Sequence, residues 1–265
     1  MSALARYFKA AGKEVCGYDK TSTSLTNALE KEGISVHFMD EISLLPEFVS
    51  GAGVNPEALI IYTPAIPKDH KQYNHFISCG YKLWKRSEVL GLITENTYTL
   101  AVAGTHGKTT TSTMIAHILR SNNVNCTAFL GGISKNYQTN LLLSDGTGTT
   151  EVVVVEADEF DRSFLTLFPD IALITSLDAD HLDIYGNKEA MVASYSQFAM
   201  QVKKNGKLIC KWGLKLHGDF SNATTYSIDQ PSTYKAVNVR VEKSNYTFDL
   251  EAGGTLFNSF LLTWP

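Results

Sequence analysis

The sequence predicts an α/β protein made of two units, each with a parallel sheet and helices on its faces. The length of 265 residues is long for one ordinary domain and suits two. Segments of strand periodicity alternate with segments of helical periodicity along most of the chain, which is typical of parallel sheets. A short polar stretch, residues 94–97, separates two such series. We therefore expect one domain over residues 1–95 and a second over residues 96–265.

The first unit opens with a helix, because apolar residues recur at helical spacing from Ala3 to Ala11 and Gly12 ends the pattern. The elements expected after it are a strand at 14–18, a helix at 23–31, strands at 35–38, 58–63 and 81–84, and a helix at 87–93. A helix followed by a strand that closes on Asp19 corresponds to the second half of a dinucleotide-type βαβ unit. We therefore expect a Rossmann-like domain whose first strand and glycine-rich turn are missing from the chain.

The second unit continues the alternation and then changes character. Its expected elements are strands at 98–103, 127–130, 151–156, 171–176 and 207–210, with helices at 109–120 and 187–202. From residue 234 to 262 short alternating apolar segments occur, and Gly253-Gly254 fits a hairpin turn between two of them. These patterns predict a doubly wound domain with an antiparallel β extension. Because the chain stops at Pro265, directly after an apolar strand, we expect this domain to be truncated as well.

Composition excludes several classes of protein. Hydrophobic residues make up 44% and charged residues 19%, which is too apolar for a disordered chain. The net charge of −4 leaves no excess of basic residues for a nucleic-acid partner, and no apolar stretch approaches the roughly 20 residues that cross a membrane. The first ten residues lack the apolar core of a signal peptide, so we expect a cytoplasmic protein. The four cysteines are too widely spaced for a zinc site or a disulfide framework.

The strongest chemical signal is the stretch GTHGKTTT, residues 104–111, between an expected strand and an expected helix. Backbone N–H groups in such a turn, together with the helix N-terminus, form a nest for phosphate oxygens. Lys108 would reach the β- and γ-phosphates of a nucleotide, and the Thr109 hydroxyl would ligate Mg²⁺. The residues expected to bind the nucleotide are Gly104, Thr105, His106, Gly107, Lys108, Thr109 and Thr110. The second domain is therefore expected to be of the P-loop ATPase type, although its loop is shorter than the standard one and an ordinary strand-to-helix turn is the alternative.

A second signal is the apolar strand at 152–155, which runs directly into the carboxylate of Glu156. A strand that ends in a carboxylate beside a phosphate loop is how P-loop enzymes hold their metal. We expect Glu156 to be a metal ligand. The acidic residues after it, Asp158, Glu159 and Asp161, fit either a solvated turn or contacts with a ligand, and the sequence leaves both open.

A third signal is His181, which lies between Asp180 and Asp183 just after the expected strand at 171–176. Ligands of open α/β sheets bind at the carboxyl ends of the strands, and a neutral imidazole is a good metal or phosphate partner. We expect His181 to be a catalytic residue and a metal ligand. Glu156 and His181 should then converge on the loop that carries Lys108.

These three stretches, GTHGKTTT, EADEFDRSFL and DADHLDIYG, together resemble the Mur ligases, the ATP-dependent amide-forming enzymes of peptidoglycan synthesis. The segments MSALARYF and TPAIP resemble parts of the family's UDP-sugar domain, so the likeness covers essentially the whole chain in register. Within the family, the likeness is greatest to the members that join L-alanine to UDP-N-acetylmuramate.

The resemblance implies that ATP and Mg²⁺ are the cofactors, and that UDP-N-acetylmuramate and L-alanine are the substrates. ATP would convert the lactyl carboxylate into an acyl phosphate, with Lys108 and His181 as the catalytic residues. The family also has a third, C-terminal domain, which this chain lacks, so we expect the chain alone to be inactive. The alternatives are a ligase that recycles a preformed tripeptide onto UDP-N-acetylmuramate, a P-loop kinase or ATPase of another family, and a nucleotide-binding module without turnover. The sequence leaves the acceptor and the oligomeric state open.

Overall fold

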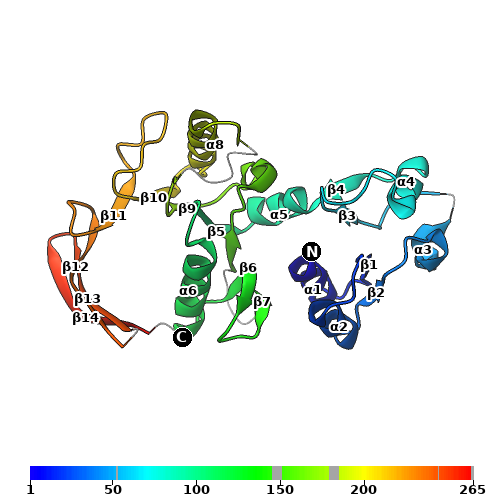
Figure 1. The fold of residues 1–265 in the computed structure, drawn as a ribbon, viewed down its shortest axis with the longest axis horizontal. Coiled ribbons are helices and arrows are strands. Elements are labelled where there is room, and N and C mark those ends of the chain that lie inside the picture. The colour runs from blue at the N-terminus through cyan, green and yellow to red at the C-terminus, as the bar shows by residue number, and fades with distance from the viewer. Residues whose placement is uncertain (52, 145–150, 179–184, 244, 264–265) are drawn as a thin grey trace.

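A computed structural model describes residues 1–51, 53–144, 151–178, 185–243 and 245–263, and for Asp161 the backbone only. The chain forms an elongated molecule in which the N-terminal elements lie at one end, and the largest sheet extends from the middle to the other end, where its last strands lie (Figure 1). Among the described residues, no helix is both long enough and apolar enough to cross a membrane.

The first unit consists of short helices and strands, including helical segments at 42–44, 47–50 and 71–78 that were not predicted. They are α1 (Ser2–Ala10), β1 (Cys16–Tyr18), α2 (Ser24–Lys31), β2 (Ser35–His37), η1 (Ile42–Leu44), α3 (Glu47–Ser50), β3 (Ile60–Tyr62), α4 (Lys71–Ser78), β4 (Leu83–Lys85) and α5 (Arg86–Glu95). The expected parallel pairing is confirmed, but the described strands make two separate sheets, β1 with β2 and β3 with β4. After β2 the chain leaves the edge of that strand through η1 and α3, and β3 pairs with β4 instead (Figure 1).

In the described part of the second unit, ten strands form one sheet. Its elements are β5 (Tyr98–Ala103), α6 (Lys108–Ser121), β6 (Cys126–Ser134), β7 (Thr139–Leu142), β8 (Val152–Glu156), η2 (Phe160–Thr166), β9 (Ile171–Ile174), α8 (Lys188–Met200), β10 (Lys207–Lys211), β11 (Thr224–Ile228), β12 (Tyr234–Glu242), β13 (Asn245–Ala252) and β14 (Thr255–Thr263). The strand order is β14-β13-β12-β11-β10-β9-β5-β8-β6-β7. Strand β5 therefore lies between β8 and β9 and is parallel to both.

The centre of the sheet is covered on both faces, which explains the unbroken run of valines in β8. Val153 and Val155 belong to one core cluster with Tyr195 and Phe198 of α8. Val152 and Val154 point the other way, into a second cluster that includes Ala116 of α6. A parallel strand buried on both faces reads as a continuous apolar segment instead of an alternating one.

Contacts from α1 and α5 join the first unit to the second. Leu4 is 2% exposed and shares a core cluster with Phe129 of β6. At the expected linker, the Lys203 ammonium donates to the carbonyls of Thr94 and Thr97, at 3.1 and 2.7 Å, and to Asp170 Oδ2 at 2.9 Å. The chain between the two units is thus fixed to the large sheet by one partly buried lysine.

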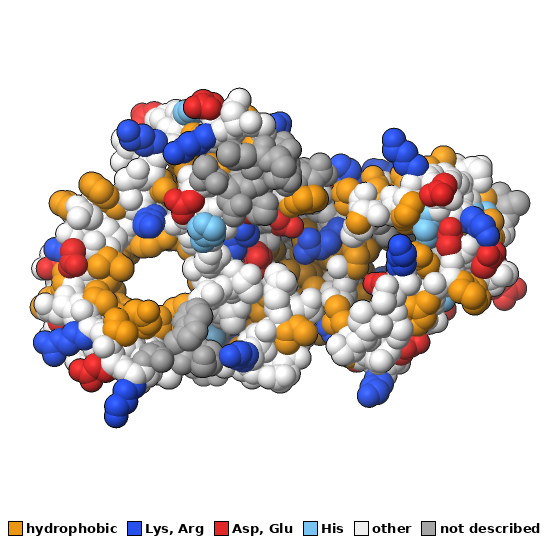
Figure 2. Space-filling view, viewed as in Figure 1, with side chains coloured by type: hydrophobic (Ala, Val, Ile, Leu, Met, Phe, Trp, Pro, Cys, Tyr) orange, Lys and Arg blue, Asp and Glu red, His pale blue; other side chains and the backbone are white. Residues whose placement is uncertain are grey.

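The predicted antiparallel extension is present as β12, β13 and β14. Gly253 and Gly254 form the two-residue turn between the last two strands, with φ values of +57° and +78°. A two-residue hairpin turn with positive φ at both positions favours glycine, which is why this turn could be read from the sequence. Strand β14 presents large apolar side chains to solvent, and hydrophobic atoms gather at this end of the molecule (Figure 2).

Candidate functional site

The glycine-rich loop lies between the end of β5 and the start of α6, as predicted. Gly107 caps α6 with a φ of +81°, and Gly104 has a φ of +136°. A Cβ at Gly104 would strike the hydroxyl of Thr175 and lie 2.9 Å from the Ser176 nitrogen, so only glycine fits between β5 and β9. The first N–H groups of α6 have no acceptor within the helix. They lie at its N-terminus, where the helix dipole is positive. The loop therefore offers an anion site at the carboxyl edge of the central strands.

Part of the loop is held by the protein itself. The N–H of Thr105 donates to the Ser176 carbonyl at 3.2 Å, and the N–H of His106 donates to Ser176 Oγ at 2.8 Å. These two amides are therefore occupied, which leaves the amides in the first turn of α6, from Lys108 to Thr110, as donors that a phosphate could use. Nucleotide binding by Thr105 and His106 stays a prediction. Since their amides are occupied, the contact would have to come from their side chains.

Lys108, the loop lysine, is held beside the nest by two contacts. Its Nζ donates to the Gly104 carbonyl at 2.7 Å and forms an ion pair with Glu159 Oε1 at 2.8 Å. The two side chains are only 14% and 3% exposed. The alternative of a solvated turn is therefore wrong for Glu159, whose carboxylate is a buried partner of the loop lysine.

Tyr185 contacts the backbone of the same glutamate. Its hydroxyl donates to the backbone carbonyl of Glu159 at 2.8 Å. Burial, with the negative charge of Glu159 as a second cause, raises the pKa of Tyr185 to about 12. The tyrosine therefore remains a neutral hydrogen-bond donor throughout the physiological range.

Glu156 ends β8 next to the loop and is fixed by two donors. The Thr109 hydroxyl donates to its Oε1 at 3.0 Å, and the Gly131 N–H donates to its Oε2 at 2.8 Å. A Cβ at Gly131 would lie 2.5 Å from the carboxyl carbon, so the carboxylate fills the space that this glycine leaves. No sequence signal singled out Gly131, because its role depends on the approach of a neighbouring strand.

The Glu156 carboxylate and the Thr109 hydroxyl fit a magnesium ion chemically, because both offer hard oxygen donors beside a phosphate nest. Within the described part of the chain, no group of three or more His, Cys, Asp or Glu side chains could hold a metal. A magnesium ion there would be bound by these protein oxygens together with oxygens of a bound phosphate, as Mg²⁺ ordinarily is.

Of the other predicted site residues, the structure describes some, and the rest lie outside the described residues. Asp158 is exposed, and its Oδ1 accepts the N–H of Phe160 at 3.0 Å. His106 and Asp178 lie at the mouth of the loop, exposed, with 3.8 Å between Nε2 and Oδ2. His181, with Asp180 and Asp183, lies outside the described residues, as does the side chain of Asp161. The convergence of His181 with Glu156 therefore stays a prediction.

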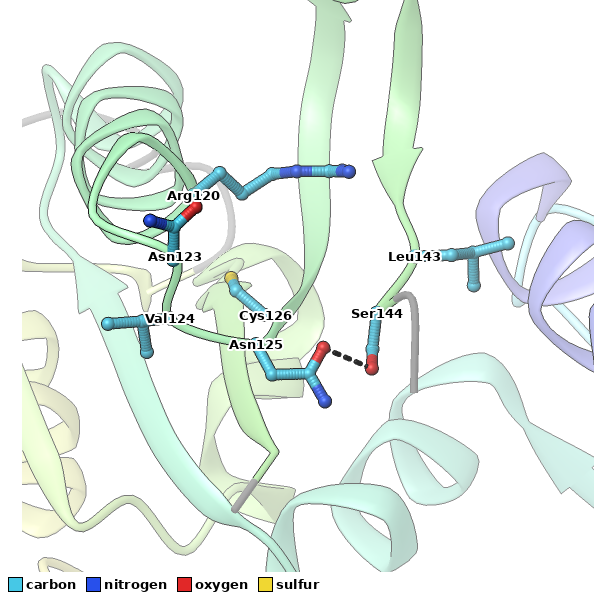
Figure 3. Close-up of a pocket in the computed structure, with 7 residues that line it drawn as sticks. All are labelled: Arg120, Asn123, Val124, Asn125, Cys126, Leu143 and Ser144. Carbon is cyan, nitrogen blue, oxygen red and sulfur yellow. Dashed lines mark hydrogen bonds between the residues drawn. The ribbon is translucent and has the colours of Figure 1, made fainter. Parts of the chain in front are cut away.

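A small cavity of about 190 Å³ lies at the opposite end of α6. Its lining residues are Arg120, Asn123, Val124, Asn125, Cys126, Leu143 and Ser144 (Figure 3). Ser144 donates to Asn125 across it, and burial raises the pKa of the Cys126 thiol to about 11. Because α6 begins at Lys108 and this cavity lies at its last turn, the cavity is separate from the phosphate loop.

Comparison with known proteins agrees with this geometry. Residues 1–98 match the catalytic domain of the Mur ligase family, and residues 102–260 match the Mur ligase middle domain. The chain belongs to the Mur ligase family. The resemblance inferred from the three motif stretches is thereby confirmed, and the phosphate loop and Glu156 both lie in the matched middle domain.

Two curated Mur ligases are similar over the entire chain. Both are named UDP-N-acetylmuramate--L-alanine ligase: that of Christiangramia forsetii is 50% identical, and that of Flavobacterium johnsoniae is 51% identical. Each alignment covers 100% of this chain and 56% of the relative. The chain thus spans little more than half the length of these two relatives.

Solved Mur ligase structures share the fold. The UDP-N-acetylmuramate-alanine ligase of Thermotoga maritima aligns with a TM-score of 0.81 at 24% identity, over 100% of this chain and 58% of its own. The UDP-N-acetylmuramate:L-alanyl-gamma-D-glutamyl-meso-diaminopimelate ligase of Neisseria meningitides aligns with a TM-score of 0.82 at 22% identity, over 100% and 83%. These similarities confirm the predicted fold class, an N-terminal Rossmann-like unit followed by a P-loop-type unit with an antiparallel extension.

Proposed function

We propose that this chain supplies the UDP-sugar domain, residues 1–95, and the ATP-binding domain, residues 96–265, of a ligase that joins L-alanine to UDP-N-acetylmuramate. The observation that carries the proposal is the phosphate nest with Lys108 and Glu156 beside it, in a chain about 50% identical to ligases of that name. The cofactors proposed are ATP and Mg²⁺.

The chemistry is dictated by the substrate. A carboxylate is a poor electrophile, so its oxygen first takes the γ-phosphoryl group of ATP and ADP leaves, which gives an acyl phosphate. The amine of L-alanine then attacks the acyl carbon, the amide bond forms and inorganic phosphate leaves. Both steps are phosphoryl or acyl transfers in which charge develops on oxygens, so they are accelerated by fixed donors and cations.

The residues of this chain would divide that work. The first-turn amides of α6 and the Lys108 ammonium would bind the phosphate oxygens and neutralise their charge. Thr109 and Glu156 would hold Mg²⁺, which when bound draws charge from the γ-phosphoryl oxygens. We further propose that His181 supplies a second metal or carboxylate contact at the same edge of the sheet.

Two other functions remain as alternatives. A ligase that attaches a preformed tripeptide shares the fold, since the Neisseria enzyme superposes well, but at 22% identity this likeness concerns the fold alone. The second alternative is a nucleotide-binding module without turnover, which would use the same phosphate nest and Lys108.

A chimeric ligase tests the proposal. The matching segment of the Flavobacterium johnsoniae ligase, which is 51% identical and aligned over all of this chain, would be replaced by residues 1–265. We expect release of phosphate that depends on UDP-N-acetylmuramate and L-alanine, and no release with the tripeptide. The same chimera with Lys108→Ala should be inactive. Phosphate release by that variant within a few-fold of the parent chimera would contradict the assignment, as would a preference for the tripeptide.

A further inference from the structure

Ser176 lies just after the end of β9 and hydrogen-bonds to the glycine-rich loop. We call the contacts that Thr175 and Ser176 make with this loop the clasp. Its Oγ lies 2.9 Å from Thr105 Oγ1 and accepts the N–H of His106 at 2.8 Å. Its backbone carbonyl accepts the N–H of Thr105 at 3.2 Å. Ser176 and Thr105 are 7% and 6% exposed, so these bonds are largely shielded from water. A serine beyond a neighbouring strand therefore satisfies two consecutive amides of the loop.

Thr175 holds the same segment from its other side. Its hydroxyl donates to the His106 carbonyl at 2.5 Å and lies 3.1 Å from the Ala103 carbonyl. The N–H of His106 is thus bound by one residue of the clasp and its carbonyl by the other. Gly104 fits against the pair so closely that no side chain could be added there. The loop is pressed onto the end of β9 with both backbone polar groups of His106 fixed.

Fixing the backbone of His106 also sets the start of the next helix. Gly107, at φ +81°, turns the chain directly into α6, so the direction of the first-turn amides depends on where His106 lies. Donors fixed before the ligand arrives need no reorganisation when it binds, which is the main source of their strength. Since both Ser176 and Thr175 are uncharged, their contribution is to geometry and not to the electrostatic attraction of phosphate.

We propose that Ser176 is a positioning residue for phosphate binding, whose hydroxyl fixes the loop so that the α6 amides and Lys108 converge on one anion. This inference rests on the ATP site of the proposed function. It assigns the amides of Thr105 and His106 to the clasp with β9 and those from Lys108 to Thr110 to the phosphate.

Substitution of Ser176 by alanine removes the acceptor of the His106 N–H and one partner of the Thr105 hydroxyl, which still accepts the N–H of Asp178 at 3.1 Å. Ser176→Thr keeps the hydroxyl and is the conservative variant. Ser196 offers a matched control in α8: it is 1% exposed, its Oγ accepts the N–H of His217 at 2.7 Å and donates to the Val192 carbonyl at 2.7 Å. Ser196→Ala therefore removes a similar buried hydroxyl away from the loop.

The experiment has two arms on the 265-residue chain. The first measures amide hydrogen exchange at His106 without ligand, which reports the clasp alone. The second measures the affinity for ATP with Mg²⁺ by calorimetry. For Ser176→Ala we expect at least about 10-fold faster exchange at His106 and about 10-fold weaker ATP binding, equivalent to about 1.4 kcal/mol. Ser176→Thr should restore most of both, and Ser196→Ala should lower stability while leaving both unchanged.

Each of the other outcomes would contradict one part of the proposal. Unchanged exchange at His106 in Ser176→Ala would show that the clasp does not form. Faster exchange with ATP affinity within two-fold of wild type would show that the clasp does not position the nest. An equal loss of affinity in Ser196→Ala would reduce the effect to general destabilisation. A wild-type chain that protects His106 but binds no ATP would overturn the proposed ATP site, and with it the positioning role, while leaving the clasp intact.

Discussion

Replacement of Gly131 by alanine should disable the proposed magnesium site at Glu156 with little effect on stability. The added Cβ would lie 2.5 Å from the carboxyl carbon and from Oε2 of Glu156, whereas ordinary contact begins at 3.4 Å. The carboxylate must therefore retreat by about 1 Å, which takes its bonds from Gly131 N–H and Thr109 Oγ1, now 2.8 and 3.0 Å, beyond hydrogen-bond length. Loss of the groups that orient a metal-ligating carboxylate lowers metal affinity by about 10- to 100-fold.

The assay is calorimetric titration of the chain with ATP at a series of Mg²⁺ concentrations. We expect the Mg²⁺ concentration that gives half-maximal enhancement of ATP binding to rise by about 10- to 100-fold in Gly131→Ala. Affinity for ATP without Mg²⁺ should change little, since the nest and Lys108 are untouched.

Gly132→Ala is the matched control, in the neighbouring position of the same strand. A Cβ there would meet only Thr109 Cγ2, at 3.4 Å, which is an ordinary contact. We expect wild-type dependence on Mg²⁺ for this variant. Equal behaviour of the two variants, or an unchanged Mg²⁺ dependence in Gly131→Ala, would refute the placement of the metal at Glu156.

Three further predictions concern stability. Lys108→Ala should lower the free energy of unfolding by about 3–5 kcal/mol, because it removes the ammonium that lies 2.8 Å from the 3% exposed Glu159 carboxylate, and adding Glu159→Gln should recover part of the loss in urea denaturation. Phe164→Ala should lower it by about 3–5 kcal/mol, because this side chain is fully buried and stacks on Phe198 at 5.2 Å; a loss under about 1 kcal/mol would contradict the packing. The pKa of Tyr185 is raised from 10.0 to about 12, so the folded state holds this proton more tightly than the unfolded state. The contribution of Tyr185 to the free energy of unfolding should therefore be fully present below pH 10 and be lost as the pH rises toward 12. Tyr185→Phe should flatten that part of the stability profile.

Local signals in the sequence were sufficient for much of the fold. The predicted helix at 109–120 is α6 (Lys108–Ser121), the predicted strand at 98–103 is β5, and the Gly253-Gly254 turn lies where it was expected. Each of these depends on periodicity, capping or turn chemistry within a few residues. Strands β7 and β11 were not predicted, because one is a four-residue partner of β6 and the other has no marked alternation. Their pairing is decided by neighbouring strands.

The sequence by itself determined the family, the position of the phosphate loop and the candidate ligand Glu156, because each is written in contiguous residues of fixed spacing. Only the tertiary structure decided that Glu159 is the buried partner of Lys108, that Gly131 makes room for the Glu156 carboxylate, and that Ser176 holds the loop. These contacts join residues 25 to 70 positions apart, and they form because β5, β6, β8 and β9 end at one edge of the sheet. Such proximity is set by strand order, and strand order results from packing both faces of the sheet, which no local pattern encodes.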